Sequence, residues 1–127
     1  MKIQIRQGVF ETNSSSTHSV AVCLSTEWDA FGRGELWISP YSGKMLPRDE
    51  AEKFNEELIS KHLERSQSWS HSYTREDIIE DYRTDLYMSY QDYYAWAETT
   101  YYEFFDMGDK LSNGVGVVTY GYYGHDY

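Results

Sequence analysis

VGVVTYGYY, residues 115–123, is the stretch that decides the fold. Val, Thr and Tyr favour pleated strands, and here they follow one another almost without interruption. A second β-rich stretch, TTYYEFF at residues 99–105, precedes it, and GDKLSNG between them is rich in turn-forming residues. The pattern therefore predicts a β-hairpin in the C-terminal part of the chain.

Three further strands are predicted in the N-terminal part. Residues 2–10 alternate between apolar and polar side chains, with Ile3 and Ile5 on one face, which is typical of a half-buried strand. Residues 20–24, VAVCL, form a short apolar run, and residues 35–39, ELWIS, lie between a glycine and a proline. With the C-terminal hairpin, these strands are expected to build a mainly antiparallel sheet.

The middle of the chain has helical periodicity. Residues 46–65 carry apolar side chains at helical spacing, and Pro47 suits a first helical turn. Residues 75–87 are a second predicted helix, because Thr74 and Asp77 have the spacing of a capping-box variant.

A third, shorter helix is predicted around the sequence YYAWA, with Ser89 or Asp92 near its start. The order of elements is three strands, then helices, then two strands, and neither a repeat nor a linker divides the chain. We therefore predict one small α+β domain over residues 1–127. Its mainly antiparallel sheet comes from the N-terminal strands and the C-terminal hairpin, with two or three helices between them.

The net charge of -10 over 127 residues limits the function classes. Binding to nucleic acid or to an anionic membrane depends on Lys and Arg that neutralise phosphates, so an acidic chain is unsuited to both. An acidic surface instead attracts basic partners, cations or a basic groove on another protein. Cys23 is alone, which excludes an intrachain disulfide, and it is expected to be a small buried hydrophobe. No signal peptide is visible, and we expect a cytoplasmic protein.

Most of the negative charge lies in residues 74–109, where ten acids and two bases give a charge of -8. Twelve of the thirteen tyrosines lie from Tyr73 onward, so we expect an aromatic surface. One interpretation is a solvated helix face over a tyrosine-rich core. Another is an acidic surface that occupies a nucleic-acid groove, with carboxylates in place of phosphates. A metal site is a third, although the loop glycine and ligand spacing of an EF-hand are missing.

The residues predicted to face a partner are Glu76, Asp77, Glu80, Asp81, Asp85, Asp92, Tyr82 and Tyr90. Within this set, Asp77, Asp81 and Asp85 are spaced to form one stripe of a continuous helix. Like charges at that spacing repel one another, so the stripe costs stability, which is compatible with a role in recognition.

The polar run FETNSSSTHS, residues 10–19, lies between two predicted strands. Its hydroxyl and amide side chains can hydrogen-bond the local backbone, which favours an ordered structural loop. Two alternatives stay open: a phosphate-binding loop, although the GxxxxGK[ST] pattern is missing, and a catalytic loop that uses a serine and a histidine. The residues singled out are Asn13, Ser14, Ser15, Ser16 and His18.

The segment RQGVFETNSSSTHSV, residues 6–20, resembles the opening of a family of small bacteriophage and prophage proteins, R-x-G-x-F-E-T-N-S-S-S-[ST]-H-S. The ending GDKLSNGVGVVTYGYYGHDY is similar to that family's ending, a G-[DN]-K turn leading to a strand that closes on G-x-Y-G. The resemblance covers about 35 of the 127 residues and implies a phage context without a particular chemistry. It suggests that the two ends meet in one sheet, with His18 near His125, Asp126 or the tyrosine run. The middle would then face a partner.

Three functions are weighed. The first, which we adopt, is a phage-encoded inhibitor that mimics nucleic acid and blocks a basic host defence protein such as a CRISPR effector. The second is a small hydrolase or a nucleotide-binding protein centred on residues 14–18. The third is an accessory or structural phage protein, a homo-oligomer that buries the tyrosine strands. The first implies a basic, nucleic-acid-binding partner in the host cytoplasm, no direct contact with nucleic acid or a membrane, and no cofactor or metal. Pairing of the chain with a second copy, as a homodimer, stays open.

Overall fold

The computed structural model describes residues 3–7, 16–66 and 73–125. Six strands and four helices lie within them, and the predicted α+β class with antiparallel sheets is confirmed. In chain order the elements are β1 (Ile3–Gln7), β2 (Ser16–Leu24), α1 (Ser25–Gly32), β3 (Leu36–Ile38), β4 (Met45–Pro47), α2 (Arg48–Ser66), α3 (Arg75–Asp81), α4 (Tyr90–Ala97), β5 (Glu103–Lys110) and β6 (Gly116–His125).

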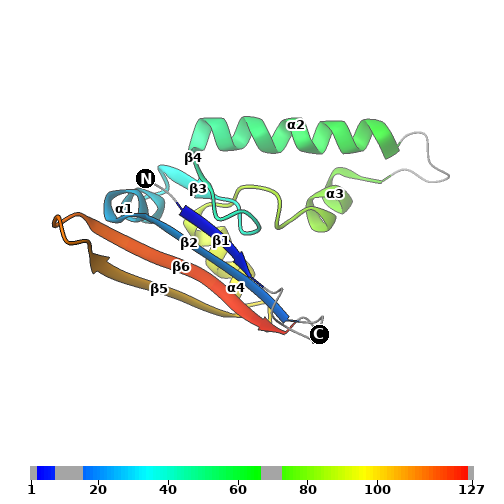
Figure 1. Cartoon of the computed structure of the whole chain (residues 1–127). Helices are drawn as coiled ribbons and strands as arrows, with labels where there is room; N and C mark the ends of the chain where they lie inside the picture. Colours follow the sequence, from blue (N-terminus) through cyan, green and yellow to red (C-terminus); the bar gives the residue numbers. More distant parts are fainter. Residues whose placement is uncertain (1–2, 8–15, 67–72, 126–127) are drawn as a thin grey trace.

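The N-terminal and C-terminal strands lie side by side in one sheet. Four strands pair in the order β1-β2-β6-β5, and every pair is antiparallel. β2 pairs with β6 along its whole length, from Ser16 opposite His125 to Leu24 opposite Val117 (Figure 1). β5 and β6 form the predicted C-terminal hairpin. The hypothesis that the two ends meet in one sheet is confirmed.

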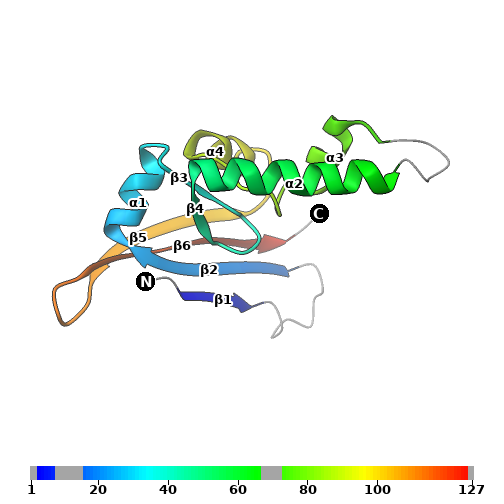
Figure 2. The same cartoon turned by 90° about the horizontal axis from the view of Figure 1, so that it is seen from above.

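α1, α4 and the small β3–β4 sheet lie against one face of the main sheet, and α2 packs on the small sheet and on α3, farther from the main sheet (Figure 1 and Figure 2). The core between the layers is strongly aromatic, and Cys23 within it is fully buried, as predicted. A smaller cluster of Ile59, Ile78 and Leu86 joins α2 to α3 and to the turn after it. The buried members of the main core are Ala21, Cys23, Phe31, Ile38, Met45, Met88, Tyr93, Trp96, Val118, Tyr120 and Tyr122.

Two tyrosines of β6 fasten the loop between β3 and β4 to the sheet. Tyr120 is 1% exposed and donates its hydroxyl hydrogen to the carbonyl of Gly43. Tyr122 donates to the carbonyl of Pro40 at 3.2 Å. Burial raises the pKa of Tyr120 above its ordinary value, so the hydroxyl stays protonated and remains a donor. Because a buried phenol is costly without a partner, these two bonds determine where the loop lies.

The first predicted helix begins later than expected. Residues 45–47 are β4 and pair with β3, with Pro47 opposite Leu36, so α2 starts at Arg48. Proline lacks an N–H and is tolerated at the edge of so small a sheet. The prediction of a helix in this segment is therefore confirmed from residue 48 onward. The first two residues of the predicted helix, 46 and 47, belong to the strand β4 instead.

The second predicted helix is shorter than expected. α3 ends at Asp81, and the N–H of Asp85 then bonds the carbonyl of Tyr82 at 2.9 Å to close a turn. This turn directs Leu86 and Tyr87 into the interior, where both are buried. The prediction of a helix to residue 87 is wrong because burial of these two side chains requires a change of chain direction.

Two elements differ more from the sequence prediction. α1 is not predicted, yet Glu27 accepts a bond from the N–H of Leu24 at 2.9 Å and Phe31 is fully buried. β5 begins at Glu103 and not at residue 99, because the hydroxyls of Thr99 and Thr100 bond back to carbonyls of α4, at 2.7 and 3.0 Å. The third predicted helix is confirmed as α4, which Ser89 caps.

Gly121→Ala is expected to destabilise the fold by about 3 kcal/mol. Gly121 has φ +156°, and a Cβ there would lie 1.8 Å from the carbonyl oxygen of Ser19 on β2. Gly108→Ala is the matched control, because a Cβ on Gly108 of β5 meets nothing within 4 Å. Its change in stability should stay within about 0.5 kcal/mol. Urea unfolding followed by circular dichroism measures both, and equal midpoints would contradict the expected close approach of β6 to β2.

Candidate protein-binding surface

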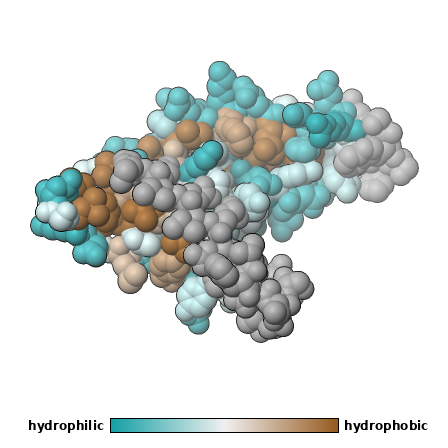
Figure 3. All heavy atoms as spheres, viewed as in Figure 1, coloured by the Kyte–Doolittle hydropathy of each residue, from teal (hydrophilic) through white to brown (hydrophobic). Residues whose placement is uncertain are grey.

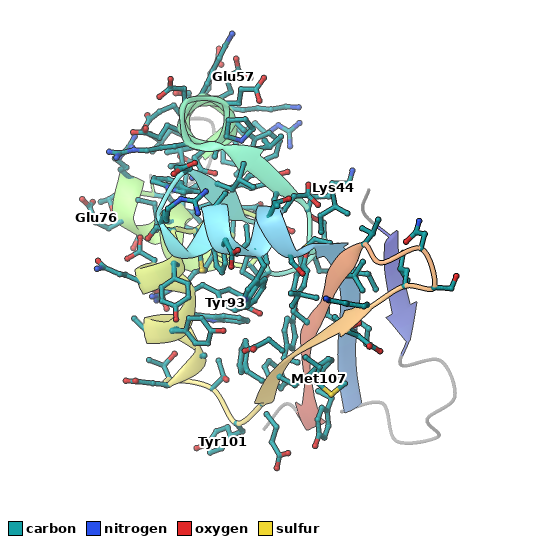
Figure 4. All side chains as sticks on the ribbon, turned by 90° about the vertical axis from the view of Figure 1, so that its left-hand side faces the viewer. Lys44, Glu57, Glu76, Tyr93, Tyr101 and Met107 are labelled. Carbon is teal, nitrogen blue, oxygen red and sulfur yellow. The ribbon has the colours of Figure 1, made fainter. Side chains whose placement is uncertain are left out.

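All ten acids between residues 74 and 109 have exposed side chains. Figure 4 shows one of them, Glu76, on α3 at the outer edge of the helical side of the molecule. We call the six predicted to face a partner the acidic surface. They are Glu76, Asp77, Glu80 and Asp81 on α3, Asp85 in the turn that follows, and Asp92 in the first turn of α4.

Both bases of this stretch are already paired with carboxylates. Arg75 forms a two-pronged ion pair with Glu56 of α2, in which one of the two N–H···O bonds is 3.0 Å long. The hydrogen bond from Arg75 lowers the pKa of Glu56, so this carboxyl stays ionised. Arg83 lies 3.6 Å from the carboxylate of Glu80. The acidic surface therefore carries no base that lacks a carboxylate partner.

Four carboxylates of the acidic surface make no ion pair with any residue that the structure describes: Glu76, Asp81, Asp85 and Asp92. Each is exposed. They are thus available to a cation from outside. In water, each such pair contributes about 0.2–1 kcal/mol, so several must act together to hold a partner.

Asp77 has a structural role. Its carboxylate accepts a bond from the N–H of Thr74 at 2.9 Å, and the hydroxyl of Thr74 accepts one from the N–H of Asp77 at 3.2 Å. This is the capping box that the sequence predicts. The predicted i,i+4 stripe is wrong in one member, since α3 ends at Asp81 and Asp85 lies outside it. Loss of Asp77 would therefore affect the start of α3 as well as the charge.

The two tyrosines predicted to face a partner differ in exposure. Tyr82 is half-buried and stacks on His62 of α2, with ring centres 3.9 Å apart and planes at 17°. It holds α2 against the end of α3. Tyr90 is 40% exposed, and its ring contacts Phe31 and Tyr94. Tyr90 is thus the better candidate for contact with a partner.

The tyrosines as a group are divided between core and surface. Four of those that the structure describes are buried: Tyr87, Tyr93, Tyr120 and Tyr122. The sequence alone did not separate these buried tyrosines from the exposed ones. Exposed rings occur elsewhere, at Tyr41, Tyr101 and Tyr123. The expectation of an aromatic surface therefore holds only for some of the tyrosines. In β6, successive side chains point to opposite faces of the sheet, which explains why Tyr122 is buried and Tyr123 is exposed.

A cleft of about 460 Å³ opens between α2, α3 and β3 beside the acidic surface. Its lining includes the apolar side chains of Trp37, Ile79, Leu86 and Met88, together with the charged side chains of Glu52, Glu56, Arg75, Arg83 and Asp92. Such a cleft suits an apolar side chain of a partner, the kind of anchor that dominates protein interfaces. Sequence reasoning missed it because its lining comes from four segments that are separate along the chain.

The amide of Asn55 ties α2 to the floor of this cleft. It donates to the carbonyl of Tyr87 at 2.9 Å and accepts from the N–H of Tyr87 at 2.8 Å. α2 buries few other residues, Ala51, Ile59 and Ser66 among those described. The Asn55 amide therefore replaces the pairing that a neighbouring strand would give Tyr87.

Asn55→Ala is expected to cost about 2 kcal/mol, because the backbone polar groups of Tyr87 lose their partners in a partly buried place. Hydrogen exchange at the Tyr87 amide should become faster by about thirtyfold, the factor that corresponds to about 2 kcal/mol. Ser60→Ala on the exposed side of α2 is the control, with no expected change. Unchanged protection of the Tyr87 amide in Asn55→Ala would contradict this role.

The polar run of the N-terminal part is only partly within the described residues. Asn13, Ser14 and Ser15 lie outside them. Ser16 and His18 belong to β2, where His18 lies opposite Tyr123 in the register. The end of the run is therefore strand backbone and not loop, which corrects the predicted start of this strand at residue 20. The predicted neighbourhood of His18 and the tyrosine run is confirmed at the level of strand pairing.

Within residues 3–7, 16–66 and 73–125, no three His, Cys, Asp or Glu side chains are grouped so that they could hold a metal ion. In the same part of the chain, every helix is too short or too polar to cross a bilayer. A scan against protein-family models found no matching family, and searches of the curated proteins and of the solved structures found no match.

Proposed function

We propose that this chain is a non-enzymatic inhibitor that binds a basic, nucleic-acid-binding protein and occupies the place of the nucleic acid. The resemblance of residues 6–20 to phage proteins supports a bacteriophage origin. The target would then be a host defence protein, such as a CRISPR effector, in the bacterial cytoplasm.

The observation that carries this proposal is the arrangement of charge in residues 74–109. The six carboxylates of the acidic surface are exposed, while the two bases of the stretch, Arg75 and Arg83, are paired with carboxylates of the same chain. Carboxylates offer Arg and Lys the same charge-assisted hydrogen bonds that phosphates offer. A surface of one sign also raises the rate at which a partner of opposite sign is encountered.

The cleft beside the acidic surface supports a protein partner over small cations. Metal ions and polyamines need carboxylates alone, whereas the cleft combines apolar side chains, Trp37 and Met88 among them, with charged side chains that include Asp92. Protein interfaces have this combination of apolar centre and polar rim. A basic partner that also carries an apolar anchor would use both features.

Neutralising the acidic surface should weaken binding to the target by about thirtyfold, from ~0.5 kcal/mol for each of four carboxylates. The variant combines Glu76→Gln, Asp81→Asn, Asp85→Asn and Asp92→Asn, and leaves Asp77 in place because it caps α3. The target is first captured at low salt from a nuclease-treated bacterial lysate and identified. Its affinity for the wild-type chain and the variant is then measured by titration at several salt concentrations, with labelled DNA as competitor.

A second variant separates the acidic surface from net charge. It combines Asp29→Asn, Glu50→Gln, Glu57→Gln and Glu64→Gln, four exposed positions on α1 and α2 that give the same charge change. It should bind nearly as tightly as the wild-type chain. The proposal fails if both variants bind equally, if affinity does not fall with salt, or if DNA does not compete.

A further inference from the structure

The face of the main sheet that points away from the helices is apolar. Strand side chains alternate, and Ala21, Cys23, Tyr120 and Phe104 belong to the core or pack against it. The residues between them in β2, β5 and β6 therefore point to the other side. We call this side the open face. Its side chains include Val20, Val22, Leu24, Phe105, Met107 and Tyr123, with Thr119 between Val22 and Met107.

None of the described helices covers the open face. Figure 4 shows the helices together on one side of the sheet. Figure 3 shows brown apolar residues toward the left-hand end of the molecule, where Figure 1 places one end of β5 and β6. Met107 is 61% exposed and Tyr123 is 44% exposed, while Val20 and Val22 remain partly exposed. Exposed apolar side chains gathered on one face in this way are typical of an interaction site.

The charge of the open face differs from that of the rest of the molecule. Its carboxylates lie at the two ends of β5, and both already accept hydrogen bonds: Glu103 from the hydroxyl of Tyr123, at 2.5 Å, and Asp109 from the N–H of Lys110, at 2.7 Å. Between them lie Phe105 and Met107. Among the side chains that the structure describes, none in the middle of this face is a carboxylate, so the surface that complements them is itself uncharged and apolar. The same face of a second copy has that chemistry.

The area of the open face is large enough for two copies of the chain to form an interface with each other. Four strands at about 4.8 Å spacing, over about eight residues at about 3.3 Å each, cover roughly 500 Å². Two such faces would bury roughly 1,000 Å² together, which is near the lower limit for specific protein interfaces. Two antiparallel sheets commonly pack in this way, with a side-chain layer about 10 Å thick between them.

We infer that this chain forms a homodimer through the open face, with the two sheets packed face to face about a two-fold axis. The helical layers, and the acidic surface with them, then lie on the outside of the dimer. An interface near this lower limit of area is expected to be weak, so the dimer should dissociate on dilution. This inference does not depend on the proposed function, because it uses different residues on the opposite side of the sheet.

Sedimentation velocity of the full chain over a wide concentration range tests the dimer. The wild-type chain should shift from monomer to dimer as its concentration rises. Met107→Lys should raise the dissociation constant at least tenfold, although it reduces the net negative charge, because it places an ammonium group in the apolar contact. Val22→Lys should have the same effect nearer the middle of the face. If Val22→Lys fails to fold, Met107→Lys on the exposed edge strand still decides the outcome.

Leu111→Lys is the matched control. Leu111 is 43% exposed but lies in the turn between β5 and β6, outside the open face, and the charge change is the same. Its dimer should be as strong as that of the wild-type chain. The inference is overturned if the chain stays monomeric at all concentrations, or if Met107→Lys dimerises as well as Leu111→Lys. Added salt should leave the dimer unchanged or strengthen it, whereas it should weaken capture of a basic target, so the two proposals can fail separately.

Discussion

The hydrogen bonds of two buried phenols in β6 determine the arrangement of most of the molecule. β6 is an inner strand and pairs with both β2 and β5, so its side chains on the helical side lie at the centre of the core. Tyr120 and Tyr122 fill that centre, and each brings a hydroxyl that must be satisfied away from water. The carbonyls of Gly43 and Pro40 satisfy them, which places the β3–β4 loop over the sheet. α2 begins directly after β4, so the position at which this helix starts depends on the same two hydrogen bonds.

This dependence follows from the composition. The chain has 13 tyrosines and only 5 phenylalanines, so its large apolar side chains mostly carry polar tips. Trp96, Phe104 and Tyr122 contact one another edge to face or tilted, with ring centres 5.2 to 5.6 Å apart. Such contacts add stability beyond the area buried. Tyrosine thus serves as core material here, and its abundance after residue 73 is not in itself a sign of a binding surface.

The parts of the fold that sequence reasoning predicted are those decided by local rules. The Thr74–Asp77 capping box and the N-cap at Ser89 are local, and so is the hairpin of β5 and β6. The meeting of the two ends followed from the family resemblance. The parts that it missed depend on distant partners. Met45–Pro47 is a strand only because β3 lies opposite.

The candidate protein-binding surface also combines features that local sequence predicts with features that depend on residues far apart along the chain. The sequence predicted the acidic residues and the structure shows their exposure, but local patterns gave no sign of the ion pair between Arg75 and Glu56, which are far apart along the chain. That pair removes a base from the acidic surface, and without it the surface would be closer to neutral. The cleft was equally hidden, because its floor joins Trp37 of β3 with Met88, and these meet through the bridge between Ile38 and Met88.

The acidic surface does not prevent two copies from pairing through the open face, because the thickness of the molecule keeps the two acidic surfaces far apart. A chain of charge -10 would seem unsuited to pair with itself. In a dimer through the open face, however, two sheets and two helical layers separate the acidic surfaces, a distance of roughly 30 Å at about 10 Å for each step. The screening length at physiological salt is about 8 Å, so repulsion over that distance is small. The carboxylates close to the contact would be those of Glu103 and Asp109, at the ends of β5, where each accepts a hydrogen bond within its own chain. Placement of charge on the helical side therefore leaves the sheet side free to associate.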